Sequence, residues 1–234
     1  MADVRPPSPG KSAPGQPVSD HPAATPPNAG DRATIWTERR KWMGNLIPMT
    51  AWLPFTGIGI FHLVQDPTNL DPIWSWLLAG VAAAWLMVNF FGLFENGKMQ
   101  SELRRKLEFR RVKVPADAIF VGMSTPSFSS LLDTHEDVGF LAIGDDAVEF
   151  MGEHRRIRIG RDEVRRIRSR ANIHTFIGLG GWICIDGVTD GKAIRLQVEP
   201  RVRSIMIANV LGRRALRGRL ETWFRGPEAQ VRKR

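Results

Sequence analysis

Hydrophobic residues dominate two stretches in the first half of the chain, and this pattern predicts two long helices. Neither 42–65 nor 72–94 contains Asp, Glu, Lys or Arg. A helix of about 20 residues crosses the hydrocarbon core of a bilayer, so we expect membrane spans at about 43–64 and 73–94. Only six residues, 66–71, separate the two spans. A connection this short predicts a transmembrane hairpin.

Prolines and small residues predict how the two spans are shaped and packed. Pro48 and Pro54 are expected to kink the first span or to shorten its regular helix. The second span carries small residues four positions apart, which let helix backbones approach closely. These helix-packing candidates are Ala79, Gly80, Ala83 and Ala84. They would pack against the first span of the same chain or against a second copy in a homodimer.

The charges that flank the spans predict their orientation. Cations precede the first span at 39–41 and follow the second from Lys98 onward, whereas the turn carries Asp66 and Asp71 and no cation. Short loops rich in Lys and Arg stay in the cytoplasm. We therefore expect a multi-pass protein of the plasma membrane, the inner membrane in a bacterium. The hairpin region, 34–98, would then leave both termini in the cytoplasm.

A basic segment, 99–114, follows the hairpin. Met99, Leu103 and Leu107 recur every four residues among its cations, which predicts a juxtamembrane helix. Lys and Arg near the cytoplasmic leaflet attract anionic lipids, so the cations are candidate lipid contacts. They are Arg104, Arg105, Lys106, Arg110 and Arg111. The alternative is a solvated orientation signal without lipid selectivity.

Beyond Pro115 the apolar pattern changes from a helical to an alternating one. The segment 156–159 alternates strictly between Arg and Ile, and Gly144-Asp145-Asp146 marks a turn between two apolar runs. Such runs predict strands at 118–121, 138–143, 147–151, 156–159, 164–167, 182–186 and 193–198. The period becomes helical again over 201–224. This order predicts an α+β domain, an antiparallel sandwich or partly open barrel capped by the C-terminal helix.

Three groups of segments in this domain share the apolar spacing of a known superfamily. They are Gly139–Ile143 with Ala147–Phe150, Ile157–Ile159 with Asp162–Ile167, and Ala193–Val198 with the helix that follows it. In these segments the chain resembles the GRAM and pleckstrin-homology-like (PH-like) superfamily, and the resemblance covers 115–226. It implies a PH-like antiparallel β-sandwich or barrel in the cytoplasm that binds lipid head groups or proteins and does not catalyse a reaction.

The positive charge of this domain lies away from the usual pocket of the superfamily. Phosphoinositide-binding PH domains carry Lys and Arg in the first inter-strand loop, and here that loop, 123–137, has neither. Arginines lie on later strands instead. The candidate contacts for anionic lipid or an acidic protein partner are Arg156, Arg158, Arg165 and Arg166. The alternative is a solvated sheet face that pairs in part with neighbouring carboxylates such as Glu153.

Composition adds two tails and a strong positive charge. Residues 1–33 are rich in Pro, Ala, Ser and Gly, which predicts a disordered tail, and 227–234 form a basic tail. The net charge of +9 favours acidic partners, including anionic lipid. Nucleic acid is disfavoured as a partner because most aromatic residues that would stack on bases lie in the predicted spans.

The sequence shows no pattern typical of catalysis or metal binding. Its five histidines are scattered, its only cysteine is Cys184, and it has neither a P-loop nor a nucleophile elbow. We therefore expect no enzyme activity, no cofactor and no metal site. The expected function is a membrane-anchored cytoplasmic binding or scaffolding module. The alternative is an accessory or regulatory subunit of a membrane transport or channel complex.

Overall fold

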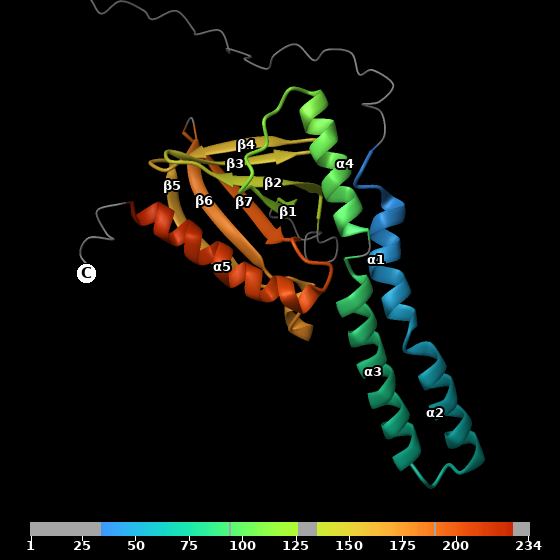
Figure 1. Ribbon diagram of the computed structural model, residues 1–234. Coiled ribbons are helices and arrows are strands. Elements are labelled where there is room, and N and C mark those ends of the chain that lie inside the picture. Colours follow the sequence, from blue (N-terminus) through green and yellow to red (C-terminus); the bar gives the residue numbers. More distant parts are fainter. Residues whose placement is uncertain (1–33, 94, 126–134, 190, 227–234) are drawn as a thin grey trace, which may run out of the picture. The chain divides into compact units, whose positions relative to one another are not determined.

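The structure of the protein, a computed structural model, describes residues 34–93, 95–125, 135–189 and 191–226 (Figure 1). The two predicted tails, 1–33 and 227–234, lie outside the described residues. So do positions 126–134, most of the loop expected between the first two strands. Within the described ranges, four helices precede a seven-stranded sheet and a fifth helix follows it.

The first predicted span, 43–64, is two helices rather than one. They are α1 (Glu38–Thr50) and α2 (Leu53–Gln65). Pro54 stands in the first turn of α2, where its missing N–H costs no hydrogen bond but its ring stops the preceding helix from continuing. Pro48 lies inside α1. The prolines therefore shorten the regular helix, as their positions predict.

The second predicted span, 73–94, corresponds to one helix, α3 (Asp71–Phe91), of 21 residues. Among the described residues, one helical stretch, which begins with α3 at Asp71, is long and apolar enough to cross a membrane. Only 18% of its apolar window is buried, which is little for the core helix of a soluble protein. α2 is apolar but has only 13 residues. The chain therefore has one candidate span by length and composition, and both the membrane crossing and the two-span hairpin stay predictions.

α2 and α3 approach each other where glycine leaves room. A Cβ atom on Gly80 would lie 3.2 Å from the Cβ of Phe55 and 3.3 Å from the carbonyl oxygen of Trp52. A Cβ atom on Gly59 would lie 3.3 Å from the Cβ of Trp76. At these distances even a Cβ atom would push the neighbouring helix away by a few tenths of an ångström, so the two glycines allow the close spacing of the helices.

The seven predicted strands are present and form one antiparallel sheet. Their bounds are β1 (Ile119–Ser124), β2 (Asp137–Ile143), β3 (Ala147–Gly152), β4 (Arg156–Gly160), β5 (Val164–Arg170), β6 (Trp182–Thr189) and β7 (Lys192–Pro200). The strand order is β4-β3-β2-β1-β7-β6-β5. The C-terminal helix follows as α5 (Met206–Arg225). The antiparallel sheet and the C-terminal helix are thus confirmed.

The sheet curls because its two edge strands are neighbours in the chain. β4 and β5 form opposite edges, yet only three residues, 161–163, join them. Three residues reach at most about 10 Å, so the two edges must come together at this corner. Hydrogen bonds fix the turn there, because the Arg161 N–H donates to the Asp146 carbonyl and the Val188 N–H donates to the Glu163 carbonyl.

Alternating residues of the strands supply two separate apolar cores. Residues such as Val121, Phe150 and Ile183 form the inner core of the curled sheet. Leu216 and Leu220 of α5 belong to the same core, so the C-terminal helix covers this face of the sheet. Neighbouring residues in a strand point to opposite faces, and the second core therefore lies on the outer face.

The outer face of β1, β2 and β3 is covered by α4 (Asn96–Phe109), the helix that corresponds to the predicted basic segment 99–114. Figure 1 shows α4 and α5 on different sides of the sheet. A buried stripe of α4 packs on Phe120 and Phe140. This stripe is Met99, Leu103 and Leu107. The apolar periodicity of the basic helix therefore reflects packing against the sheet.

Candidate functional site

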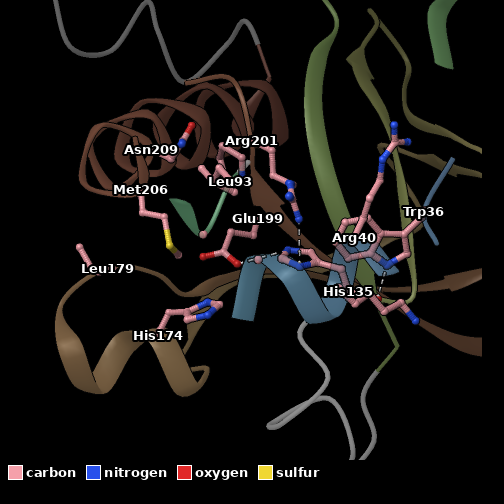
Figure 2. A pocket seen from close by; sticks show the side chains of 14 residues that line it. Trp36, Arg40, Leu93, His135, His174, Leu179, Glu199, Arg201, Met206 and Asn209 are labelled. Carbon is pink, nitrogen blue, oxygen red and sulfur yellow. Dashed lines mark hydrogen bonds and ion pairs between the residues drawn. The ribbon is translucent and has the colours of Figure 1, made fainter. Parts of the chain in front are cut away.

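Buried polar side chains gather where α1, the connection from α3 to α4, and β7 meet (Figure 2). His135, Glu199 and Arg201 lie at the centre, and all three are buried. Glu199 is on β7, Arg201 follows that strand directly, and His135 stands two residues before β2. Glu199 alternates with Val198 of the inner core, so its side chain points to the outer face of the sheet.

The three central groups form a row in which an imidazole lies between opposite charges. His135 Nε2 is 3.3 Å from Glu199 Oε2, an ion-pair distance without hydrogen-bond geometry. His135 Nδ1 is 3.4 Å from Arg201 Nη1. Because a guanidinium group only donates, Nδ1 must accept, and the proton of a neutral imidazole is on Nε2. That proton faces the carboxylate.

Neighbouring groups hold the carboxylate and the imidazole in place. Glu199 accepts hydrogen bonds from Asn172 Nδ2 at 3.1 Å and from the Gly181 N–H at 2.9 Å. The ring of His135 lies against the backbone of Gly122 in β1, so closely that a Cβ atom there would overlap the imidazole. Any larger residue at Gly122 would therefore displace His135.

Arg201 connects the end of β7 to the start of α4 and to the segment before α1. Its Nε donates to Asn96 Oδ1 at 3.2 Å, and Asn96 is the first residue of α4. Its guanidinium carbon lies 4.8 Å from the centre of the Trp36 ring, a cation–π contact. Trp36 in turn donates from Nε1 to the carbonyl oxygen of His135 at 2.8 Å. The site therefore joins three segments that are far apart in sequence.

Burial sets the protonation states of these groups. Desolvation lowers the pKa of His135 to about 4, so its imidazole is neutral near neutral pH. Desolvation also lowers the pKa of Arg201 to about 10, which still leaves the guanidinium charged. For Glu199 desolvation acts to raise the pKa, but contacts with His135 and other neighbours outweigh it, and the pKa is lowered. One negative and one positive charge are thus buried together.

The cavity at this junction is too small for an organic ligand. Its volume is about 30 Å³, whereas pockets for organic ligands have volumes of about 300 Å³ or more. A space of this size holds a water molecule or two. His174 lines the cavity, and its Nδ1 has no hydrogen-bond partner within the part of the chain that the structure describes. The arrangement fixes charges in place and leaves no room for an organic substrate.

A second cluster has the spacing of metal ligands but is used by the fold. Ligand atoms of Asp137, Glu153 and His154 lie within 4.8 Å of one another. The Asp137 carboxylate accepts three backbone N–H groups of the turn after β3. The Glu153 carboxylate accepts the N–H groups of Ile35 and Trp36 at 2.7 and 2.9 Å. These bonds tie the segment before α1 to the sheet, which is a structural role.

The predicted lipid-contact cations of α4 have different environments. Lys106 Nζ lies 3.0 Å from Glu153 Oε1 and is largely buried. Arg110 donates to the carbonyl oxygen of Glu153 at 2.9 Å, and the guanidinium carbon of Arg104 lies 4.9 Å from the centre of the Phe140 ring. The exposed members of the set are Arg105, Arg110 and Arg111. Contact of these cations with lipid stays a prediction.

The arginines predicted as partner contacts on β4 and β5 are exposed, and most of them form ion pairs. The pairs join Arg156 to Glu149 (2.5 Å), Arg158 to Asp146 (3.0 Å) and Arg166 to Asp186 (3.3 Å). Arg165 has no ion-pair partner among the described residues. Glu153, which the sequence offered as a partner, instead holds the segment before α1. Exposed pairs contribute at most about 1 kcal/mol, so these arginines stay available to other anions.

The predicted helix-packing residues lie along α3 with unequal burial. Gly80 is buried and faces α2 of the same chain. Ala79, Ala83 and Ala84 are half-buried. The close contact at Gly80 supports packing within the chain, and a homodimer contact stays a prediction.

Sequence reasoning missed the group of His135, Glu199 and Arg201. The three residues come from a loop, the end of a strand and the segment after it, and no spacing rule connects them. One signal was present, because Glu199 alternates with apolar residues in β7. Alternation alone identifies such a position as solvent-facing, and it gives no sign that a helix covers that face.

Comparisons with known proteins add no assignment to this geometry. No protein-family model matches the chain, and no curated protein or solved structure matches it significantly. The functional argument therefore rests on the residues and contacts of the chain itself.

His135 makes the stability of the fold depend on pH. Its pKa is about 4 in the folded protein, against an ordinary value of 6.5. Below pH 6.5 the unfolded chain binds a proton that the folded protein does not take up until about pH 4. The stabilisation is therefore complete above pH 6.5, and about 3 kcal/mol of it is lost as the pH falls to 4. Urea unfolding in detergent micelles across this range measures the loss.

Two histidine substitutions make this measurement specific. In His135→Gln the amide can accept from Arg201 and donate to Glu199 but does not titrate, so the free energy of unfolding should vary less between pH 6.5 and 4. The control is His154→Gln, since the side chain of His154 is 54% exposed. If His135→Gln kept the pH dependence of the wild type, the buried imidazole would not be its source.

Proposed function

We propose that the protein is a membrane-anchored module that holds a PH-like domain at the cytoplasmic leaflet, where the domain binds protein or anionic lipid. The observation that carries this proposal is the exposure of large apolar side chains along α2 and α3. They include Phe61, Val64, Trp74, Leu78 and Val81. Surface helices in water carry a polar face opposite the core, so apolar surface on this scale fits acyl chains better than water.

The dimensions of the helices fit a hairpin across a bilayer. α3 has 21 residues, a length of about 32 Å, against roughly 30 Å for the hydrocarbon core. α2 alone is too short, and the return span would consist of α2 with the second half of α1. Close packing at Gly59 and Gly80 supports this pairing.

Charges at the ends of the hairpin support an orientation with both termini in the cytoplasm. Arg40 Nε lies 2.8 Å from Glu95 Oε2, and Arg40 Nη1 lies 3.0 Å from Glu102 Oε2. These pairs hold the start of α1 beside the start of α4, as two antiparallel spans require. The opposite end carries Asp66 and Asp71 in the turn. Basic residues favour the cytoplasmic side, which is therefore the side of the sheet.

The arrangement of the sheet supports assigning it to the PH-like class. Seven antiparallel strands curl until β4 meets β5, and a C-terminal helix packs on the inner core. The small polar cavity leaves no room for an organic substrate at this junction, which favours a structural role for its buried charges. Exposed cations such as Arg105, Arg111 and Arg165 are the surface on which an anionic partner would bind.

Cysteine accessibility tests the topology. Asn69→Cys places a thiol in the turn of the hairpin, and Lys113→Cys places one after α4, at two exposed positions. In intact cells a membrane-impermeant maleimide should label only Asn69→Cys, whereas Lys113→Cys should react after permeabilisation. The wild type controls for Cys184, which is buried. Labelling of Lys113→Cys in intact cells would contradict the proposed orientation.

A further inference from the structure

A group of exposed apolar side chains lies outside the hairpin, at one end of the sheet domain. It comes from the short helix η3 (Ile173–Ile177) and from the first turns of α5. We call these residues the apolar ledge, and they are Phe176, Ile177, Ile207 and Leu211. Phe176 and Leu211 are 79% and 66% exposed. Large apolar side chains with this exposure, on segments that lie close together, are typical of interaction surfaces.

Two hydrogen bonds fix the position of the apolar ledge along the axis of α3. Trp85 Nε1 donates to the carbonyl oxygen of Ile177 at 2.9 Å. Asn89 Oδ1 accepts the Ile207 N–H at 2.9 Å and so caps α5, which has no side-chain cap of its own. Trp85 and Asn89 are four residues apart and lie on the same face of α3. η3 and the start of α5 are therefore attached to one face of α3, about one turn apart.

An apolar contact reinforces this attachment. Leu93, Leu179 and Met206 form a small buried core, with Trp85 and Val88 of α3 packed against it. Leu179 follows η3 and Met206 begins α5. The two parts of the apolar ledge are thus joined to each other and to the end of α3, and they cannot move far along that helix.

The attachment places the apolar ledge near the end of the proposed span. α3 ends at Phe91, and at 1.5 Å per residue Trp85 lies about 9 Å and Asn89 about 3 Å before that end. If α3 crosses the whole hydrocarbon core, the ledge lies in the last ~10 Å before the cytoplasmic boundary. Interfacial amphipathic helices bury their apolar faces to a depth of about 5–10 Å.

We propose that the apolar ledge inserts into the cytoplasmic face of the bilayer, at the boundary between head groups and acyl chains. The inference rests on the proposed membrane anchor and adds a second membrane contact, made by the sheet domain itself. The exposed cations Arg203 and Arg214 lie next to the ledge in sequence and fit anionic head groups. With two contacts the domain has a fixed orientation on the membrane surface.

Depth-dependent quenching in the full-length protein tests this insertion. Three single substitutions each introduce a thiol for an NBD fluorophore at an exposed apolar residue: Phe176→Cys in the ledge, Leu78→Cys within α3 and Phe109→Cys at the far end of α4. The proteins are reconstituted in vesicles of phosphatidylcholine and phosphatidylglycerol that carry nitroxide groups on the acyl chains. Wild-type protein controls for labelling of Cys184, and circular dichroism checks that each variant is folded.

The expected result is loss of NBD emission at positions 78 and 176, with emission retained at 109. Quenching at position 78 without quenching at position 176 would contradict insertion of the apolar ledge and would leave the proposed membrane anchor standing. Absence of quenching at position 78 would contradict the membrane anchor, and with it the insertion of the apolar ledge. Protection of position 176 from aqueous iodide without lipid quenching would mean that protein, such as a second copy of the chain, covers the ledge, and it would also overturn the proposal.

Discussion

Replacing Arg201 by methionine is expected to lower the free energy of unfolding by about 3–5 kcal/mol, because it leaves a buried carboxylate without its counter-charge. Arg201 and Glu199 are both buried, and His135 lies between them at 3.4 and 3.3 Å. Methionine keeps most of the side-chain volume but supplies no positive charge. Urea unfolding in detergent micelles, followed by near-ultraviolet circular dichroism, measures the change.

Two further variants separate the buried charge from packing. The double variant E199Q/R201M leaves no charge in the site, so its loss of stability should be smaller than the sum of the losses of the two single variants. Arg166→Met removes an arginine from an exposed pair with Asp186 and should change stability by no more than about 0.5 kcal/mol. Strictly additive effects at Arg201 and Glu199 would contradict the view that their charges interact.

Replacing Gly80 by valine is expected to destabilise the helix pair by about 1–3 kcal/mol, the usual cost of overpacking. The new Cβ atom would lie 3.2 Å from that of Phe55 and 3.3 Å from the carbonyl oxygen of Trp52, and two methyl groups would extend beyond it. α2 would then have to move away from α3. Thermal unfolding in detergent micelles measures the loss.

Gly57 provides the matched control for this substitution. It lies in α2, and a Cβ atom there would have no neighbour within 4 Å. Gly57→Val therefore introduces the same β-branched side chain into an apolar helix without a clash. Equal losses of stability for the two valine variants would mean that the cost comes from the helix backbone and not from the contact between α2 and α3.

The strands were predictable because their signals are local. Alternation sets the face of each side chain, and turn residues such as Gly144 and Asp146 separate consecutive strands, so β2 and β3 can be located without knowledge of the rest of the chain. The first span was predictable only in part. The uncharged stretch 42–65 marks an apolar segment, but the break before Leu53 depends on how Pro54 ends the preceding helix.

The candidate site could not be predicted because it depends on which surfaces become covered. The stripe on α4 shows that one face of the helix is buried and does not say that Phe120 and Phe140 are what it contacts. In the same way, the position of Glu199 in an alternating strand looks solvent-facing until Asn172 and the helical segments close over it. Such coverage depends on contacts between residues far apart in sequence.

The hydrogen bonds that Glu153 accepts from the segment before α1 have a mechanical consequence. Glu153 holds Ile35 and Trp36 just before α1, and α4, which follows α3 in the chain, packs on the sheet. Both ends of the helical hairpin are therefore attached to the sheet by contacts among the described residues. A bilayer that changes thickness makes its helices tilt. If α3 crosses the bilayer as proposed, a tilt of α3 would rotate the attached sheet with it, and the orientation of the sheet would then follow the thickness of the membrane.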